Sequence, residues 1–456
     1  MLPALVAVML TGLALAAPAQ AAAPKITLKP TSGPPTAKVK VTGSGFGTAE
    51  TVLVDFDATL VSSPTTDAGG AFATSFNVPA SASSGTHTVM ATGQTSGLSS
   101  SRGFDVSVDW AGFRFDAANT GFNPYENTLN TGNVSGLGQA WSYATGDQVT
   151  TAPAVVNGIA YFGSLDHNLY AVDASTGTFL WKYTTGDYVD TPPAVANGVV
   201  YFGSLDDKVY AVNATTGAFK WSYTTGGFVI PGPQVVKGVV YIGSSDGNLY
   251  ALNASTGGYL WSFHTGSRVE STPAVVKGVV YFGSSDDDVY AVNASTGAEM
   301  WHFATGNQVE SSPAVVKGVV YVGSVDGSVY ALNATTGTKI WSTATGFLVV
   351  GSPAVANKVV FVGNAGGEFY ALKTSNGKKA WPIFDSLDGG FRTSAVVANG
   401  VAYAATDGGA LYAFDASSGH QVLSTTVGFT PLTSPAVVNG TVYVGSSDHS
   451  MYALGL

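Results

Sequence analysis

The sequence predicts an all-β protein, in which a small β-sandwich is followed by an eight-bladed β-propeller. The first observation is a forty-residue unit that recurs from Ala152 to the end of the 456-residue chain. The second is that each unit divides at Gly or Asp into four short runs, for example PQVV, VVYIGSS, NLYALN and YLWSFHT. Because VVYIG and LYAL are apolar at both parities, both faces of each four-stranded sheet must be buried, and sheets packed around an axis achieve this.

The two ends of the repeat array indicate a closed ring. The chain enters the array at Trp141, in the position of a fourth strand, and leaves it at 451–454, just after a third strand. One N-terminal and three C-terminal strands would complete the last blade, which predicts eight blades with 3+1 strand closure. A straight solenoid would also bury both faces of its sheets, but it would need distinct polar caps.

A glycine and a tryptophan recur around the third and fourth strands, here called C and D. The glycine is predicted in the C–D turn, where a left-handed residue is cheap only for glycine. The tryptophan carries a large apolar area to the seam between blades, and we interpret both residues as structural. The tryptophans are Trp141, Trp181, Trp221, Trp261, Trp301, Trp341 and Trp381, with Leu423 in the eighth position, and the glycines are Gly177, Gly217, Gly257, Gly297 and Gly337.

The first residues predict export. Residues 1–23 form an apolar run that ends in small residues, as in a signal peptide cleaved after Ala21 or Ala23. We therefore expect a secreted, cell-surface or periplasmic protein that does not span the membrane after cleavage. The chain contains no cysteine, which excludes disulfides, thiol catalysis and cysteine-ligated metals.

Residues 24–108 are predicted to form the β-sandwich. Alternating runs such as TVLVDFDATLV and GAFATSFNV are separated by turns rich in Gly, Pro and Ser. The opening PTSGP…VTGSGF resembles the immunoglobulin-like IPT/TIG domains of exported proteins. We interpret residues 109–140 as a lead-in linker and residues 141–456 as the propeller.

The repeat resembles the tryptophan-docking motif of quinoprotein dehydrogenases and of the PQQ-like repeat family. The pattern Ala-x-(Asp/Asn)-x-x-Thr-Gly-x-x-x-Trp matches in five blades, and DWAGFRFDAANTGFNPYENTL is similar to the segment before the first blade in such proteins. The resemblance implies an eight-bladed propeller. It also implies two functions, because family dehydrogenases hold pyrroloquinoline quinone (PQQ) near calcium and against a vicinal Cys-Cys disulfide, whereas other members are non-catalytic envelope proteins.

We expect a non-catalytic binding or scaffold protein of the cell envelope or extracellular space. Without cysteine the family disulfide cannot form, and few basic groups are available near the expected funnel to hold the quinone, so neither PQQ nor calcium is expected. No catalytic constellation is visible. A PQQ-dependent dehydrogenase lacking the disulfide and a cell-wall or polysaccharide binder remain alternatives.

The expected partner is a protein or another envelope component, bound by a monomer. A formal charge of −10 with scattered Lys and Arg disfavours nucleic acid. With antiparallel strands named A to D, the D–A and B–C connections share one face of the ring, here the D–A face, and the A–B and C–D turns share the other, here the A–B face. Read as structure, the charged turn residues are turn-formers and solvated charges; read as function, they give the ring an acidic and a basic face that would orient a partner. The B–C turns carry Asp166, Asp206, Asp246, Asp286, Asp326, Asp407 and Asp448, and the A–B turns carry Lys237, Lys277, Lys317 and Lys358.

The near-identical repeats disagree most in their D–A connections, where loops from all blades converge at the axial funnel. We predict a ligand or partner site there, although neutral drift of exposed loops would give the same pattern. His167 and His449, in B–C turns of blades that closure makes neighbours, suggest a zinc site, but the distance between adjacent blades argues against it and no metal is predicted. The predicted funnel residues are Tyr188, Asp190, Phe228, Arg268, Glu270, Glu310, Phe347, Phe391, Arg392 and Phe429.

Overall fold

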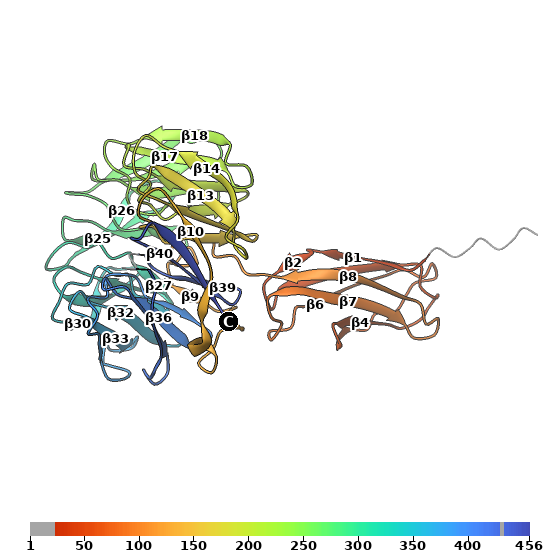
Figure 1. Cartoon of the computed structure of the whole chain (residues 1–456). Helices are drawn as coiled ribbons and strands as arrows, with labels where there is room; N and C mark the ends of the chain where they lie inside the picture. Colours follow the sequence, from red (N-terminus) through yellow and green to blue (C-terminus); the bar gives the residue numbers. More distant parts are fainter. Residues whose placement is uncertain (1–22, 429–432) are drawn as a thin grey trace, which may run out of the picture. The chain divides into compact units, whose positions relative to one another are not determined.

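The computed structural model describes residues 23–428 and 433–456, and within them it is built almost wholly of β-strands (Figure 1). The chain divides into two compact units. The first comprises the described residues up to Ala80 together with Gly85–Val106, and the second comprises Ser81–Ser84 and Ser107–Leu456. In these described ranges no helix is long and apolar enough to cross a membrane.

The first unit packs two sheets against each other. Strands β3 (Lys38–Ser44) and β4 (Val52–Phe56) alternate buried residues with exposed or half-buried ones, as expected where one face of a sheet covers a core. Phe56 of β4 contacts Phe76 of β6 (Phe72–Asn77) across the two sheets, with ring centroids 6.0 Å apart. That the unit is immunoglobulin-like stays a prediction. One sheet orders β1 (Lys25–Lys29), β3 (Lys38–Ser44) and β6 (Phe72–Asn77), and the other orders β2 (Ser32–Gly33), β8 (Ser99–Val106), β7 (Gly85–Gly93), β4 (Val52–Phe56) and β5 (Thr59–Ser62).

The second unit contains eight sheets, which we number as blades 1 to 8 along the chain. In blades 1 to 7 the strands follow one another in the order A to D, and every pair is antiparallel. The first three blades are β11 (Ala154–Val156), β12 (Ile159–Gly163), β13 (Asn168–Asp173) and β14 (Phe179–Thr184); β15 (Ala194–Ala196), β16 (Val199–Gly203), β17 (Lys208–Asn213) and β18 (Phe219–Thr224); and β19 (Gln234–Val236), β20 (Val239–Gly243), β21 (Asn248–Asn253) and β22 (Tyr259–His264).

Blades 4 to 7 continue the series. They are β23 (Ala274–Val276), β24 (Val279–Gly283), β25 (Asp288–Asn293) and β26 (Glu299–Ala304); β27 (Ala314–Val316), β28 (Val319–Gly323), β29 (Ser328–Asn333) and β30 (Lys339–Ala344); β31 (Ala354–Ala356), β32 (Val359–Gly363), β33 (Glu368–Lys373) and β34 (Phe384–Asp385); and β35 (Val396–Ala398), β36 (Val401–Ala405), β37 (Ala410–Asp415) and β38 (Gln421–Thr426).

Blade 8 joins the two ends of the unit. It orders β39 (Ala436–Val438), β40 (Thr441–Ser446) and β41 (Ser450–Gly455), and β10 (Gly138–Ala144) pairs antiparallel to β41 as the outermost strand. Each A strand contacts the A strand of the next blade around the whole ring, including β11 against β39. The all-β propeller expected from the repeat is confirmed.

Burial follows the position of a strand in its blade. The B and C strands are buried on both faces, so that β12 and β13 expose no residue, whereas the D strand β14 alternates exposed and covered residues. This pattern explains the runs that are apolar at both parities: each central strand lies between two neighbouring blades.

The seams between blades are held by the recurring tryptophans. Trp181 of blade 1 donates its Nε1–H to the carbonyl of Ala214 in the C–D turn of blade 2, at 3.1 Å, and Tyr161 donates to the same carbonyl. The indole lies so close to Gly217 that a Cβ there would be 2.6 Å from the ring, and Gly217 has φ +69°. The equivalent donors Trp141, Trp221, Trp261, Trp301, Trp341 and Trp381 contact the next blade in the same way.

The exception at Leu423 has a topological reason. Leu423 faces blade 8, whose D strand β10 comes from the N-terminal side of the array and pairs with the C strand β41, so no C–D turn joins these two strands. A tryptophan at this seam would have no turn carbonyl to bind. For the same reason the buried hydroxyl of Tyr403, at the position of Tyr161, finds no hydrogen-bond partner.

The segment interpreted as a lead-in linker is part of the propeller. Two backbone hydrogen bonds join Trp110 to Val155 in blade 1, and β9 (Phe122–Asn123) pairs parallel to β35 in blade 7. Residues between them bond to the inner strands of blades 2 to 6, and Asn123 Nδ2 donates to the carbonyl of Val437 in blade 8. Residues 110–123 therefore bond to all eight inner strands, whose free edges face the axis, and fill the space that these strands enclose. The intermediate bonds join Ala111 to Val195, Asp116 to Gln234, Ala117 to Val275, Ala118 to Val315, Thr120 to Val355 and Gly121 to Val397.

Candidate functional site

The D–A connections place one residue of each blade around the mouth of the funnel. Each connection contains a buried residue, such as Val229, whose side chain packs over the glycine that ends the B strand. The next residue, four before each A strand, differs from blade to blade. We call these residues the axial ring: Thr150, Asp190, Ile230, Glu270, Glu310, Val350 and Arg392, with the eighth position at 432, outside the described residues.

Three members of the axial ring are carboxylic acids. Asp190 accepts a hydrogen bond of 2.6 Å from Thr150 Oγ1 of the neighbouring blade, and its burial raises its pKa despite that bond. Burial also raises the pKa of Glu310, and the neighbouring Glu270 carboxylate raises it further, whereas Arg392 lowers it. The ring therefore concentrates negative charge in a partly desolvated place, where a cation would relieve the cost of ionisation.

Each of the two arginines predicted for the funnel already lies beside a carboxylate. Arg268 Nη1 lies 3.6 Å from Glu270 Oε1, and Arg392 Nε lies 3.2 Å from Asp407 Oδ2. Both guanidinium groups are more than half exposed, so these pairs are solvated and exchangeable.

Three predicted aromatic residues lie on the surface of this face. Tyr188, Phe228 and Phe347 are 39%, 49% and 56% exposed, respectively. The prediction for Phe391 is wrong: its side chain is fully buried, because the two-residue-longer connection of blade 6 puts Phe391 in the position of the recurring valine, over Gly363. Phe429 lies outside the described residues.

Beneath the axial ring, hydroxyl groups link successive blades. In blades 3 to 7 a backbone N–H just before the A strand donates to the side-chain oxygen of the equivalent residue in the next blade, at 2.8–3.0 Å. This chain of bonds holds neighbouring inner strands in register, so that the ring residues stand on a rigid base. The linked residues are Gly232, Thr272, Ser312, Ser352, Ser394 and Ser434.

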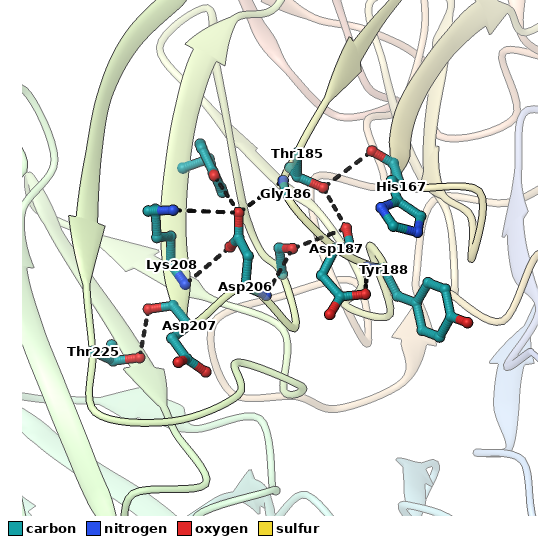
Figure 2. Close-up of polar contacts among 11 residues, drawn as sticks. His167, Thr185, Gly186, Asp187, Tyr188, Asp206, Asp207, Lys208 and Thr225 are labelled. Carbon is teal, nitrogen blue, oxygen red and sulfur yellow. Dashed lines mark hydrogen bonds and ion pairs between the residues drawn. The ribbon is translucent and has the colours of Figure 1, made fainter.

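The aspartates of the B–C turns accept hydrogen bonds from groups of the propeller itself, so their carboxylates are not free charges on the surface. Asp206 Oδ2 accepts from the Gly186 N–H of the preceding D–A connection, at 2.9 Å, and from the Tyr210 hydroxyl, at 2.5 Å, and it lies 3.6 Å from Lys208 Nζ (Figure 2). In the same view the Tyr188 ring lies apart from this cluster. Asp166, Asp246, Asp286 and Asp326 make the equivalent pair of bonds.

The two histidines considered for zinc have other neighbours. The His167 ring meets the Tyr188 ring edge to face at 5.2 Å, and His449 Nε2 lies 3.7 Å from Asp147 Oδ1. Over the described ranges, no three His, Asp or Glu side chains come together in a group that could hold a metal ion.

One buried arginine was not predicted from the sequence to have a role. Arg114, on the segment that fills the axis, is fully buried and donates from both terminal nitrogens to the carbonyls of Ala395 and Pro353, while its Nε has no partner. Burial lowers its pKa to about 9, and Asp116 opposes that change. Arg114 thus ties the axial segment to blades 6 and 7, and no side-chain spacing in the sequence could have indicated this.

One known protein family has a model that matches the repeats of this chain. The family model described as outer membrane protein assembly factor BamB matches residues 132–268, 224–308, 249–384 and 383–455, which together span most of the chain. No curated protein matches the sequence.

Several solved structures share the fold at low sequence identity. BamB from Moraxella catarrhalis is 18% identical over 70% of this chain and all of its own, with a TM-score of 0.62. The quinohemoprotein alcohol dehydrogenase from Comamonas testosteroni is 17% identical over 76% of this chain and 80% of its own, with a TM-score of 0.66. The computationally designed protein Ika8 is 18% identical over 70% and 99%, with a TM-score of 0.62. These structures show the fold alone.

Proposed function

The chain belongs to the PQQ-like repeat family whose model is described as outer membrane protein assembly factor BamB, and from this premise we propose that it is an exported, non-catalytic binding scaffold of the cell envelope. The observation that carries the proposal is the axial ring. Asp190, Glu270 and Glu310 share with Arg392 and three neutral residues a position that varies while the structure around it repeats. The partner is a protein segment that carries cationic side chains.

The charge and shape of the D–A face support such a partner. Burial raises the pKa of Asp190 and Glu310 more than Thr150 and Arg392, respectively, lower it, and an inserted Lys or Arg would add positive charge beside both carboxylates. Tyr188, Phe228 and Phe347 offer exposed rings on which the apolar parts of the same segment can pack.

The same ring argues against the quinoprotein alternative. PQQ carries three carboxylates, and its site must supply converging basic groups. Here the nearest basic residues are Arg268 and Arg392, each already beside a carboxylate, and the ring itself adds Asp190, Glu270 and Glu310. The chain also has no cysteine for the family's disulfide. We infer that these residues do not fit the quinone.

The test is site-specific photo-crosslinking in the native envelope fraction. A photo-crosslinking residue at Tyr188, Phe228 or Phe347 should capture one protein, whereas the matched exposed positions Phe219 and Tyr259, on outer D strands, should not. Adding Asp190→Asn, Glu270→Gln and Glu310→Gln together should abolish the adduct without lowering the melting temperature.

Three outcomes would contradict the proposal. Equal crosslinking at inner and outer positions would show that the funnel is not the site, and adducts with wall polysaccharide would favour the carbohydrate-binding alternative. Saturable uptake of PQQ with calcium by the purified protein, together with dye reduction driven by an alcohol or a sugar, would favour the dehydrogenase.

A further inference from the structure

Positive charge is collected on one sector of the A–B face. Blades 5 and 6 carry six exposed lysines there, in their A–B turns and around their C–D turns, on 314–381. The only acidic residues of that stretch, Asp326 and Glu368, lie in the B–C region at the other end of the strands. The six are Lys317, Lys339, Lys358, Lys373, Lys378 and Lys379, and we call them the lysine sector.

Nothing in the described part of the chain neutralises this charge. No carboxylate oxygen lies within 4.0 Å of any of the six ammonium groups, whereas Lys208 on the D–A face pairs with Asp206. The A–B face of other blades carries acids such as Asp173, Glu299 and Asp415. The lysine sector is therefore a local feature in a chain whose formal charge is −10.

An apolar groove opens inside the lysine sector. It lies between blades 5 and 6, has a volume of about 760 Å³, and has Lys317 and Lys358 in its lining. Val316, Val319 and Phe122 line it as well. The equivalent grooves between blades 3 and 4 and between blades 4 and 5 measure about 390 and 430 Å³. The largest of these three grooves thus coincides with the only sector of this face that has many lysines and no acid.

We propose that this groove binds an acidic protein segment that also carries apolar side chains. Carboxylates of the segment pair with the lysines, which act as mobile point charges, while its apolar side chains cover Val316, Val319 and Phe122. A purely ionic polymer would pair with the lysines but leave the apolar lining of the groove exposed to water. Lysines and apolar surface together therefore favour a protein segment. This site is separate from the cation-seeking axial ring and has the opposite polarity.

The test measures fluorescence anisotropy of two labelled peptides against the full chain, with a third peptide as an unlabelled competitor. One peptide alternates Glu with Leu, the second has the same Glu positions with Ser in place of Leu, and the third alternates Lys with Leu. The Glu–Leu peptide should bind saturably and more weakly as salt rises, at least tenfold tighter than the Glu–Ser peptide. Unlabelled Lys–Leu peptide, whose charge suits the axial ring, should not displace the Glu–Leu peptide from the groove.

Matched variants locate the site. Lys317→Gln, Lys358→Gln and Lys373→Gln together should weaken binding of the Glu–Leu peptide at least tenfold. The same change of charge at Lys182, Lys208 and Lys220, in blades 1 and 2, should alter it less than twofold.

A second pair of variants tests the apolar lining. Val319→Ser should weaken the Glu–Leu peptide several-fold, whereas Val279→Ser, the equivalent change in the groove between blades 4 and 5, should not. Equal affinity for the Glu–Ser peptide or for inorganic polyphosphate would overturn the proposal in favour of a simple polyanion surface. Equal loss in the two lysine triples, or no binding of the Glu–Leu peptide, would overturn it outright. The axial-ring triple Asp190→Asn, Glu270→Gln and Glu310→Gln should leave this binding unchanged, which separates it from the function proposed above.

Discussion

The seams between blades and the axial ring are made from the same forty-residue unit. The residues at the seams are the same in most blades, whereas the residues of the axial ring differ from blade to blade. At a seam, Trp221 is fixed by a hydrogen bond to Ala254 and by contact with Gly257, so that any other residue leaves a cavity or a clash. At the ring, the preceding residue, such as Val229, is buried in the core, whereas the next side chain is only half-buried or exposed. The unit therefore permits change where loops converge on the axis, and a binding site can be placed there without cost to the blades.

The largest expected effect is at a seam. Trp261→Ala should lower the free energy of unfolding by about 3–5 kcal/mol, because it empties a buried indole site and leaves the Ala294 carbonyl with the Tyr241 hydroxyl as its remaining side-chain donor. Chemical denaturation of the full chain measures this change. Tyr259→Ala, two residues away and 54% exposed, is the control, and a similar loss in both variants would mean that the seam is not special.

The next effect concerns an aspartate that bridges two blades. Asp246 accepts from Gly226, Tyr250 and Asn248; although burial raises its pKa, these hydrogen bonds outweigh burial and hold the pKa below its usual value. Asp246→Asn should cost about 1.5–3 kcal/mol at neutral pH. Because the pKa is lower in the folded state, this stabilisation is lost as pH falls through it, and the two proteins should converge below about pH 4. Denaturation at neutral pH and below pH 4 measures both stabilities, and Asp385→Asn, at an exposed position, is the control. If the difference in stability between wild type and Asp246→Asn were the same in acid, the ionised Asp246 carboxylate would not be what stabilises the fold.

A smaller effect separates backbone conformation from packing. Gly257 and Gly238 both have positive φ, but a Cβ on Gly257 would lie 2.7 Å from the Trp221 ring, whereas a Cβ on Gly238 would meet nothing within 4 Å. Gly238→Ala should cost about 1–2 kcal/mol from conformation alone, and Gly257→Ala should cost more. Equal melting temperatures for the two variants would show that the indole moves aside.

The smallest effect has the opposite sign and lies in the axial ring. Burial and Glu270 raise the pKa of Glu310, so its ionised form destabilises the fold above that pKa. Glu310→Gln should stabilise the protein at pH 7.5, by no more than about 0.5 kcal/mol, and the gain should vanish as pH falls and the wild-type carboxyl becomes protonated. Thermal melts at pH 7.5 and 4 measure it. Glu299→Gln, which removes an exposed partner of His302, should give no gain. A loss of stability in Glu310→Gln would mean that the ring carboxylate is structural.

The repeat itself made the blades and their seams predictable, because side chains such as Trp181 and Gly217 leave a fixed spacing in the sequence. Phe391 was misjudged since the insertion in its connection hid its correspondence to valines such as Val349; counting back from the A strand would have revealed it. The axial segment could not be foreseen, because it binds the blades mainly through its backbone, and backbone bonds leave no pattern of residue types. The lysine sector was only partly predicted, because the A–B turns contribute two of its six lysines and the other four lie around the C–D turns that fold beside them.

The axial segment also bears on the order in which the protein forms during synthesis. It precedes every blade in the chain, so each inner strand, on leaving the ribosome, meets a hydrogen-bonding edge that already exists. Closure comes last and over a long distance, with Asn123 and Val437 separated by 314 positions. The entropic cost of closing a loop grows only slowly with its length. Because the axial segment forms first and each blade then joins it in turn, the ring assembles through a series of shorter closures instead of one long-range event.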